Sequence, residues 1–260
     1  MPTEPCRSLA AFAIPAFPIV KQGDDLASLI VETAVRAGIS LQTGDVVVLA
    51  QKVVSKAEGR YLDLRSLKPS PRALELAART GKDPQLVEAI LRESTEIVGA
   101  GPNIIIAAHH CGVVLANAGI DRSNVGDSAD DSVVLLLPQE PDRTCREIRQ
   151  GLLDRLGIDL AVVINDSLGR PWRQGTVGTA IGASGVPALL DLRGRPDLFG
   201  RMLMVSQEAI ADEIAATAQL IQGQADEGQP VVVVRGRFNW GAPDRGAASL
   251  LRPKSDDLFR

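Results

Sequence analysis

Aromatic residues are scarce in this chain, with one Tyr, two Trp and five Phe among 260 residues. Proteins that bind single-stranded nucleic acid stack bases on aromatic side chains, so this scarcity argues against that class. The net charge of −4 lacks the basic balance that nucleic acid and membrane surfaces attract. No apolar run reaches the roughly 20 residues needed to span a bilayer. We therefore expect no nucleic-acid or membrane partner, and small charged substrates instead.

Cysteine is also rare: the three residues Cys6, Cys111 and Cys145 form no CxxC pair. This spacing fits neither a zinc site nor a disulfide framework and is typical of a reducing cytoplasm. The N-terminal segment lacks the basic and then continuously apolar pattern of a secretory signal. We therefore expect a cytoplasmic protein that folds without disulfides or a structural metal.

Several common motifs are missing from the sequence. It contains no GxxxxGK[ST] phosphate-binding loop, no GxGxxG after a strand and no GxSxG nucleophile elbow. His109 and His110 are adjacent, so on a strand they would point to opposite faces and could not readily bind one ion together. Any nucleotide site must therefore be of another type, and covalent acyl-enzyme schemes are disfavoured.

Local patterning predicts both helices and strands. Ser70-Pro71 and Asp83-Pro84 each place a capping side chain before a proline at the first helical position. Further helices are predicted from residue 26 and over residues 142–156 and 206–222. Strands are predicted over residues 46–50, continued by 51–59, and over 102–107, 112–116, 160–164 and 231–234. Because these elements do not alternate regularly, we expect an α+β fold with mixed sheets and two intertwined subdomains.

The domain organisation is expected to be simple, with one domain over residues 1–240 and a loose tail over residues 241–260. Small residues crowd the segment 175–189, GTVGTAIGASGVPAL. They suit either a loop close to a ligand or the close packing of a helix on a sheet. Both interpretations stay open at this point.

The segment INDSLGRPWRQG, residues 164–175, is the most chemically informative part of the chain. Asp166 and Ser167 are hard oxygen ligands suited to Mg²⁺ or Mn²⁺, and Arg170 and Arg173 can bind phosphate or carboxylate in bidentate fashion. Asp121 stands in a second polar loop, and the two carboxylates together could hold one or two divalent cations. The alternative is that Asp166 and Ser167 only cap a turn.

Lysines could complete such a site. Lys52 and Lys56, with the two arginines, could neutralise phosphate charge during phosphoryl transfer. The alternative for the lysines is the solvated edge of a strand, where lysine commonly guards against aggregation.

Four segments together resemble one known family. They are QKVVSKAEG from Gln51, ANAGIDRSNVG from Ala116, INDSLGRPWRQG from Ile164 and ADEIAATAQLIQGQADEGQPVVVVRG from Ala211. Their order and length resemble the coenzyme F420-0:γ-glutamyl ligase family, over a stretch from about Ile14 to Gly236. Four long motifs in the right order are far more specific than any single short pattern.

The resemblance implies a GTP-dependent ligase that adds L-glutamate to the terminal carboxylate of F420-0. GTP would phosphorylate that carboxylate, and the glutamate amine would attack the acyl phosphate, releasing GDP and phosphate. The physical chemistry agrees, because a carboxylate is a poor electrophile until its oxygen becomes a good leaving group. The family's fold is mixed α and β, and its members form homodimers.

The resemblance also implies the site residues. Asp121 and Asp166 match the ligands of a first divalent cation, Mn²⁺ or Mg²⁺, and Ser167 with Gln224 match those of a second; K⁺ is a further candidate. The residues that fall where the family binds GTP are Ile14, Pro15, Ala16, Phe17, Gln51, Lys56, Asn124, Gln222, Gly223, Gln224, Ala225, Asp226, Glu227, Gly228 and Gln229. Arg170 and Arg173 are our own addition, as contacts for the acidic tail of F420-0 or for glutamate.

Two alternative functions stay open. One is the same metal- and nucleotide-dependent ligation on a different phosphate-linked acid or on a variant of F420-0, since kinship in fold does not fix the substrate. The other is a non-catalytic nucleotide-binding protein. The number of glutamates added and the origin of a preference for GTP over ATP are not determined by the sequence.

Overall fold

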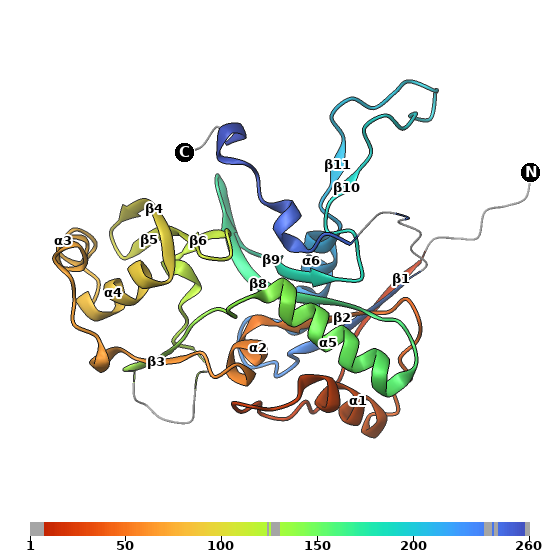
Figure 1. Ribbon diagram of the computed structural model, residues 1–260, viewed down its shortest axis with the longest axis horizontal. Coiled ribbons are helices and arrows are strands. Elements are labelled where there is room, and N and C mark those ends of the chain that lie inside the picture. The colour runs from red at the N-terminus through yellow and green to blue at the C-terminus, as the bar shows by residue number, and fades with distance from the viewer. Residues whose placement is uncertain (1–7, 124, 126–130, 237–240, 242–243, 258–260) are drawn as a thin grey trace, which may run out of the picture.

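The structure is a computed structural model that describes residues 8–123, 125, 131–236, 241 and 244–257. Helices and strands are both abundant, and the strands form separate antiparallel and mixed sheets, so the expected α+β class is confirmed. Figure 1 shows a main body around a five-stranded sheet, a smaller lobe with α3, α4 and β4 to β6, and an arm that begins at β10 and β11.

The central sheet has the strand order β1-β12-β2-β8-β9. Its bounds are β1 Leu9–Ala13, β2 Val46–Ala50, β8 Ala161–Arg170, β9 Arg173–Ser184 and β12 Val231–Gly236. Only the β2–β8 pair is parallel; the other pairs are antiparallel. The Val runs of β2 and β12 are fully buried because helices cover both faces of the sheet.

The helices that cover this sheet begin and end at recognisable residues. On one face lie α1 Leu26–Arg36, whose first turn is capped by Asp25, and α5 Pro141–Leu156, which ends at the left-handed Gly157. On the other face lies α6 Ile210–Gln222. The predicted helix over residues 206–222 therefore starts later than expected, because residues 207–208 form the short strand β11.

One predicted strand is wrong. Residues 51–57 do not continue β2 but form the helix α2, Gln51–Ala57. Val53 and Val54 are buried in the core beneath the sheet, which a helix achieves by turning adjacent apolar residues to the same side. The alternative explanation of Lys52 and Lys56 as a strand edge is thereby also wrong, because both lie on this helix.

The smaller lobe packs two helices on a three-stranded sheet. The helices α3 Pro71–Thr80 and α4 Pro84–Arg92 begin as predicted, capped by Ser70 and Asp83. The sheet contains β4 Ser94–Gly101, β5 Ile104–His109 and β6 Val114–Ala116, of which β4 was not predicted. Strands β3 Tyr61–Asp63 and β7 Val133–Leu135 pair beside it, and the short turns η1 Leu64–Ser66 and η2 Asn117–Gly119 complete the lobe.

A buried ionic cluster lies within this lobe. His109 is 2% exposed, and its Nε2 lies 3.4 Å from Glu93, whose carboxylate also forms a 2.7 Å ion pair with Arg60. The Cys111 sulfur lies 3.1 Å from Nδ1 of His109. Burial opposes a charge on the imidazole, but the contacts with Cys111 and Glu93 outweigh it and raise the pKa of His109 to about 9.

This cluster gives a pH prediction. We expect the free energy of unfolding to fall as the pH rises from about 6.5, the ordinary pKa of histidine, to about 9. Below pH 6.5 the imidazole is protonated in the folded and in the unfolded protein, and its contacts make their full contribution to stability. Above pH 9 the imidazole has lost its proton in the folded protein as well, and this contribution is gone. The expected loss is roughly 3 kcal/mol. Urea denaturation across this range measures it.

Two variants test the assignment of this pH dependence. His109→Gln should flatten the decrease between pH 6.5 and 9, whereas His110→Gln, at the neighbouring exposed position, should keep it. An unchanged slope in His109→Gln would show that another group titrates.

The hairpin of β8 and β9 explains the small residues of segment 175–189. A Cβ atom on Gly178 would lie 2.5 Å from the carbonyl oxygen of Ala215 on α6, and one on Gly182 would lie 2.7 Å from the backbone of Pro141 on α5. The glycines therefore let both helices pack closely on β9. Of the two interpretations of this segment, helix-on-sheet packing is confirmed.

The C-terminal segment is not loose where the structure describes it. Ala247 is buried, and the backbone N–H groups of Ala247 and Ala248 donate to the Asp142 carboxylate. The short turns η3 Ala247–Leu250 and η4 Lys254–Asp256 follow. The prediction of a loose tail is wrong for these residues, because Asp142 binds the segment to the start of α5.

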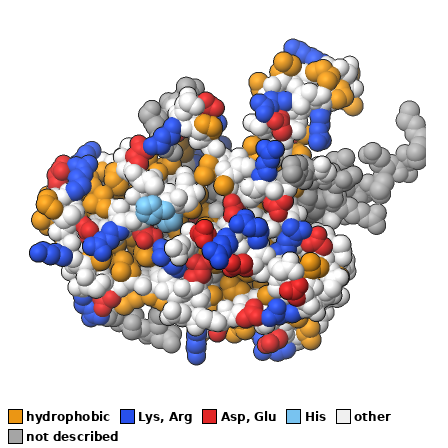
Figure 2. Space-filling model, viewed as in Figure 1, with side chains coloured by type: hydrophobic (Ala, Val, Ile, Leu, Met, Phe, Trp, Pro, Cys, Tyr) orange, Lys and Arg blue, Asp and Glu red, His pale blue; other side chains and the backbone are white. Residues whose placement is uncertain are grey.

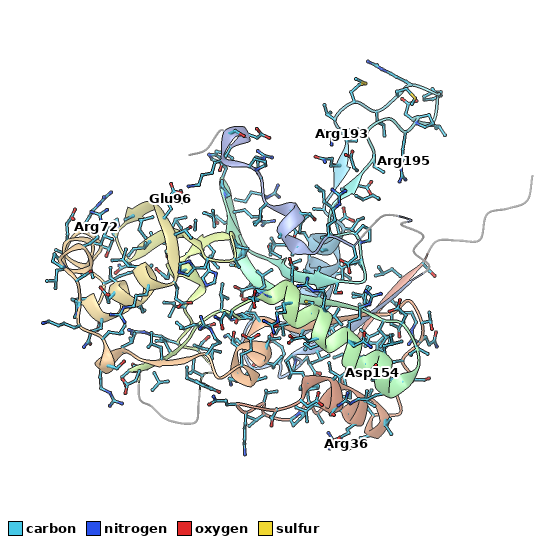
Figure 3. The ribbon with its side chains drawn as sticks, in the orientation of Figure 1. Arg36, Arg72, Glu96, Asp154, Arg193 and Arg195 are labelled. Atoms are coloured by element: carbon cyan, nitrogen blue, oxygen red, sulfur yellow. The ribbon has the colours of Figure 1, made fainter. Side chains whose placement is uncertain are left out.

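An arm projects from the body between β10 Leu190–Asp191 and β11 Gln207–Glu208 (Figure 1). Arg193 and Arg195 lie along it near these strands (Figure 3). Beyond them, apolar side chains are exposed, including Leu198 and Phe199 at 91% each (Figure 2). Within the described ranges, every helix is too short or too polar to cross a membrane.

Candidate functional site

Asp166 lies in the middle of β8 and not in a loop after the strand. The strand continues to Arg170 because β9 pairs with it along this whole length, with Asp166 opposite Thr179. Burial raises the pKa of Asp166 to about 6; the Ser167 N–H, which donates to its Oδ1 at 2.8 Å, lowers it, and the charge of Asp121 raises it again. The alternative of a turn or cap at this position is therefore wrong: Asp166 is a partly buried carboxylate within a strand.

Asp121 reaches the same place from the smaller lobe. Its backbone forms two 2.9 Å hydrogen bonds with Leu135, which fix the residue against β7. Its Oδ1 accepts hydrogen bonds from the backbone and hydroxyl of Ser123, and its Oδ2 forms a 2.8 Å ion pair with Lys52 of α2. The positive charge of Lys52 also lowers the pKa of Asp166. One lysine thus lies beside two carboxylates that come from distant parts of the sequence.

A cavity of about 290 Å³ opens beside Asp166 and Lys52, which line it, whereas Asp121 does not line it. It lies between the end of β2, helix α2, strand β8 and the loop after α6. Its wall combines amide, hydroxyl and ammonium groups with apolar side chains such as Phe17, Ile19 and Val53, a mixture that is typical of a ligand site. The candidate residues that line it are Phe17, Gln51, Lys56, Asp166, Ser167, Gln222, Gly223, Gln224, Ala225, Glu227, Gly228 and Gln229.

A network of side-chain amides holds one wall of the cavity. Asn165 donates from Nδ2 to Gln219 at 2.7 Å and to Gln222 at 2.6 Å, both on α6. Gln222 in turn donates to the carbonyl oxygens of Val48 and Pro230. The side-chain nitrogens of the glutamines donate to carbonyl groups, so their side-chain oxygens are left to accept from Asn165. The Asn165 amide must therefore present its nitrogen to them, which fixes its orientation. The network was not predicted, because the sequence around Asn165 indicates only a strand and the sequence around Gln219 indicates only a helix.

The loop after α6 depends on a glycine. Gly223 has φ of +70°, and the carboxylate of Glu227 occupies the space where a side chain would begin. That carboxylate accepts a hydrogen bond from the Ala225 N–H, which lowers the pKa of Glu227. The buried Oε1 of Gln229 has no donor among the described residues, so it can accept a hydrogen bond from a ligand in the cavity.

Other predicted nucleotide contacts lie elsewhere. Ile14 is fully buried in the core and donates its N–H to Val231, while Pro15 and Ala16 form an exposed turn outside the cavity wall. Asp226 is exposed and does not line the cavity. Asn124 lies outside the described residues.

The structure does not bring Arg170 and Arg173 into the cavity. They face each other at the exposed tip of the β8–β9 hairpin, around Trp172, which has φ of +58°. The sequence placed them next to Asp166, but an extended strand carries a residue about 3.3 Å further with each step. The prediction that they contact a substrate at the reacting groups is therefore not supported by their position.

The donor set near the carboxylates fits a hard divalent cation. Asp121, Asp166, Ser167 and Gln224 offer carboxylate, hydroxyl and amide oxygens, the ligands that Mg²⁺ and Mn²⁺ prefer. Clusters of three or more His, Cys, Asp or Glu are absent from the part of the chain that the structure describes. A cation here would therefore rely on neutral oxygens as well as on the two carboxylates.

Comparison with known proteins gives a consistent result. Residues 16–236 match the family model described as F420-0:gamma-glutamyl ligase. A protein of Methanothermobacter thermautotrophicus, named coenzyme F420:L-glutamate ligase, is 46% identical over 97% of this chain and 99% of its own length. Proteins of the same name from Methanopyrus kandleri and Halobacterium salinarum are 49% and 44% identical, over 93% and 96% of this chain and 93% and 95% of their own lengths.

Proposed function

Because the chain belongs to the F420-0:γ-glutamyl ligase family, we propose that it is a ligase that joins L-glutamate to the terminal carboxylate of F420-0. We propose that GTP drives the reaction through an acyl phosphate. The observation that carries the proposal is the group of Asp121, Lys52 and Asp166 beside a polar cavity. Phosphoryl transfer between anions needs such fixed charges, because catalysis there depends mainly on positioning and electrostatics.

In this proposal the nucleotide occupies the cavity beside Asp166. Lys52 and Lys56 on α2 supply positive charge for its phosphates, and the loop of residues 223–229 wraps around it. Gln229 accepts a hydrogen bond from the nucleotide through its otherwise unpaired Oε1. The ammonium group of Lys52 is fixed in place by an ion pair with Asp121 and a hydrogen bond to Ser123. It would therefore not have to move when negative charge develops on the phosphate.

The same site would hold two divalent cations, Mn²⁺ or Mg²⁺. Asp121 and Asp166 would bind the first, and Ser167 with Gln224 the second; K⁺ is a further candidate cofactor. Bound cations would neutralise phosphate charge and polarise the transferred group. The protein's own contribution is to hold the two carboxylates near each other with the ammonium group of Lys52 beside them.

We also propose that the protein works as a cytoplasmic homodimer. Four apolar side chains along the arm, Leu198, Phe199, Met204 and Val205, are 77% to 91% exposed. Patches of this kind usually mark an interaction site. A second copy of the chain would cover them.

Mass spectrometry tests the reaction directly. Protein incubated with F420-0, L-glutamate, GTP and Mn²⁺ should yield product heavier by one or more glutamate residues, and EDTA should abolish it. With ¹⁸O in the carboxylate of F420-0, one labelled oxygen should appear in the released phosphate, as an acyl phosphate requires. Nucleotide binding without turnover would favour a binding protein, and turnover only with another acid would favour a different acceptor.

A further inference from the structure

A second cavity, of about 450 Å³, lies along the sheet from the first one. It is bounded by the edge strand β9, the start of α5, the end of the smaller lobe's sheet and the C-terminal segment (Figure 1). The candidate site described above uses none of its residues.

The two cavities meet at one pair of residues. Asp166 lines the first cavity, and Thr179, directly opposite it on β9, lines the second. Directly opposed residues of an antiparallel pair point to the same face, with Cβ atoms about 5 Å apart. Along β8, Ser167 lines the first cavity and the next residue, Leu168, lines the second. A ligand in the second cavity can therefore bring a functional group to the carboxylate that borders the first.

Part of the wall of the second cavity is apolar. Val113, Val114, Leu168, Ile181 and Leu250 line it, and Leu168 and Ile181 lie on the same face of the sheet as Asp166. Such a wall suits an extended ligand with a flat or apolar body. Glutamate has almost no apolar surface and would leave this apolar part of the wall without contact.

The charged groups of the wall favour an acidic ligand. Asp142 accepts the N–H groups of Ala183 and Ala247, and Asp212 accepts that of Ala180, so both acids are already used by the backbone. Glu140 and Arg143 also line the cavity and form an ion pair with each other at 3.0 Å. Arg146 lines it too, and no ion pair of Arg146 is found among the residues that the structure describes. Its guanidinium is therefore available to a carboxylate or phosphate.

We propose that this second cavity is the binding site of the acceptor, F420-0. Its body lies against the apolar wall, Arg146 binds its acidic tail, and its terminal carboxylate reaches the Asp166–Thr179 pair. This inference rests on the proposed function, because it assigns one of that reaction's substrates. The wall formed by Ala247, Ala248 and Leu250 lies beyond residue 236, where the family match ends.

Two variants and two matched controls test the site. Ala248 is exposed at the rim, so Ala248→Trp should narrow the cavity without disturbing the core, whereas Ser255→Trp places the same side chain on the same segment outside it. Arg146→Gln removes the available charge. Arg72→Gln removes a charge on α3 (Figure 3), at a residue that lines neither cavity. Steady-state kinetics and calorimetric titration with F420-0 alone are the measurements.

The expected result is selective for one substrate. Ala248→Trp and Arg146→Gln should each raise the KM and Kd for F420-0 at least tenfold, with the KM for GTP within twofold of the native value and both controls unchanged. Native values for F420-0 in both variants, or an equal rise in the KM for GTP, would overturn the inference. A native protein that does not glutamylate F420-0 at all would instead refute the proposed function.

Discussion

Replacing Asp166 with Asn is expected to lower kcat for glutamylation roughly a thousandfold, the loss typical of removing one electrostatic contact to developing charge in a water-poor site. The amide has almost the same shape, and its oxygen can still accept the Ser167 N–H. What it removes is a partly buried negative charge that interacts with the charge of Asp121. Activity should therefore collapse while the protein stays folded.

Stability measurements separate this prediction from simple unfolding. A buried charge near a like charge is costly, so the midpoint of urea denaturation in Asp166→Asn should equal or exceed the native value. Asp83→Asn is the matched control, because it makes the same change at the cap of α4, where Asn caps as well as Asp. It should keep both stability and kcat.

Metal dependence adds a second readout. If the Asp166 carboxylate acts through a cation, raising the Mn²⁺ concentration should restore part of the lost activity. An Asp166→Asn protein that consumes GTP at the native rate would exclude any role of this carboxylate in phosphoryl transfer. Asp121→Asn should behave similarly, but it also removes the ion-pair partner of Lys52.

The elements that were predicted correctly carry their own local signals. Helices α3 and α4 begin at a capping residue followed by proline, and α3 ends at Gly81 in the left-handed conformation. These signals act within a few residues, so a sequence reveals them without knowledge of the fold.

The elements that were missed depend on distant parts of the chain. Lys52 and Lys56 are four residues apart, which fits the repeat of a strand and of a helix alike. The burial of Val53 and Val54 against the sheet decides for the helix. Residues 166–170 look like a turn, yet they extend β8 because β9 offers hydrogen-bond partners to the hairpin tip. Contacts that are remote in sequence override local preference in both cases.

The candidate site also contains features that the sequence predicted and features that it did not. Asp121 and Asp166 were expected to lie together, as acids in polar segments that could share a cation. Their pairing through Lys52 was not, since α2 was expected to be a strand. Arg170 and Arg173 were expected at the site because they follow Asp166 closely, but the strand carries them to the tip of the hairpin.

Replacing Gly178 with Ala is expected to destabilise the protein by about 3 kcal/mol, at the upper end of the usual cost of overpacking. The new methyl group would lie 2.5 Å from the carbonyl oxygen of Ala215 and 2.9 Å from Oδ1 of Asn165. The first is helix backbone and the second is held by two hydrogen bonds to α6, so neither can simply rotate away.

Relief of this clash would require α6 to move from the sheet, and the cavity wall would move with it. We therefore expect Gly178→Ala to weaken GTP binding as well as stability, because Gln222 and the loop of residues 223–229 follow the end of α6. Gly169→Ala is the matched control in the same hairpin, since a Cβ atom there meets nothing within 4 Å. Urea denaturation and nucleotide titration of both proteins measure the effects. A Gly178→Ala protein as stable as Gly169→Ala would mean that α6 does not pack this closely on β9.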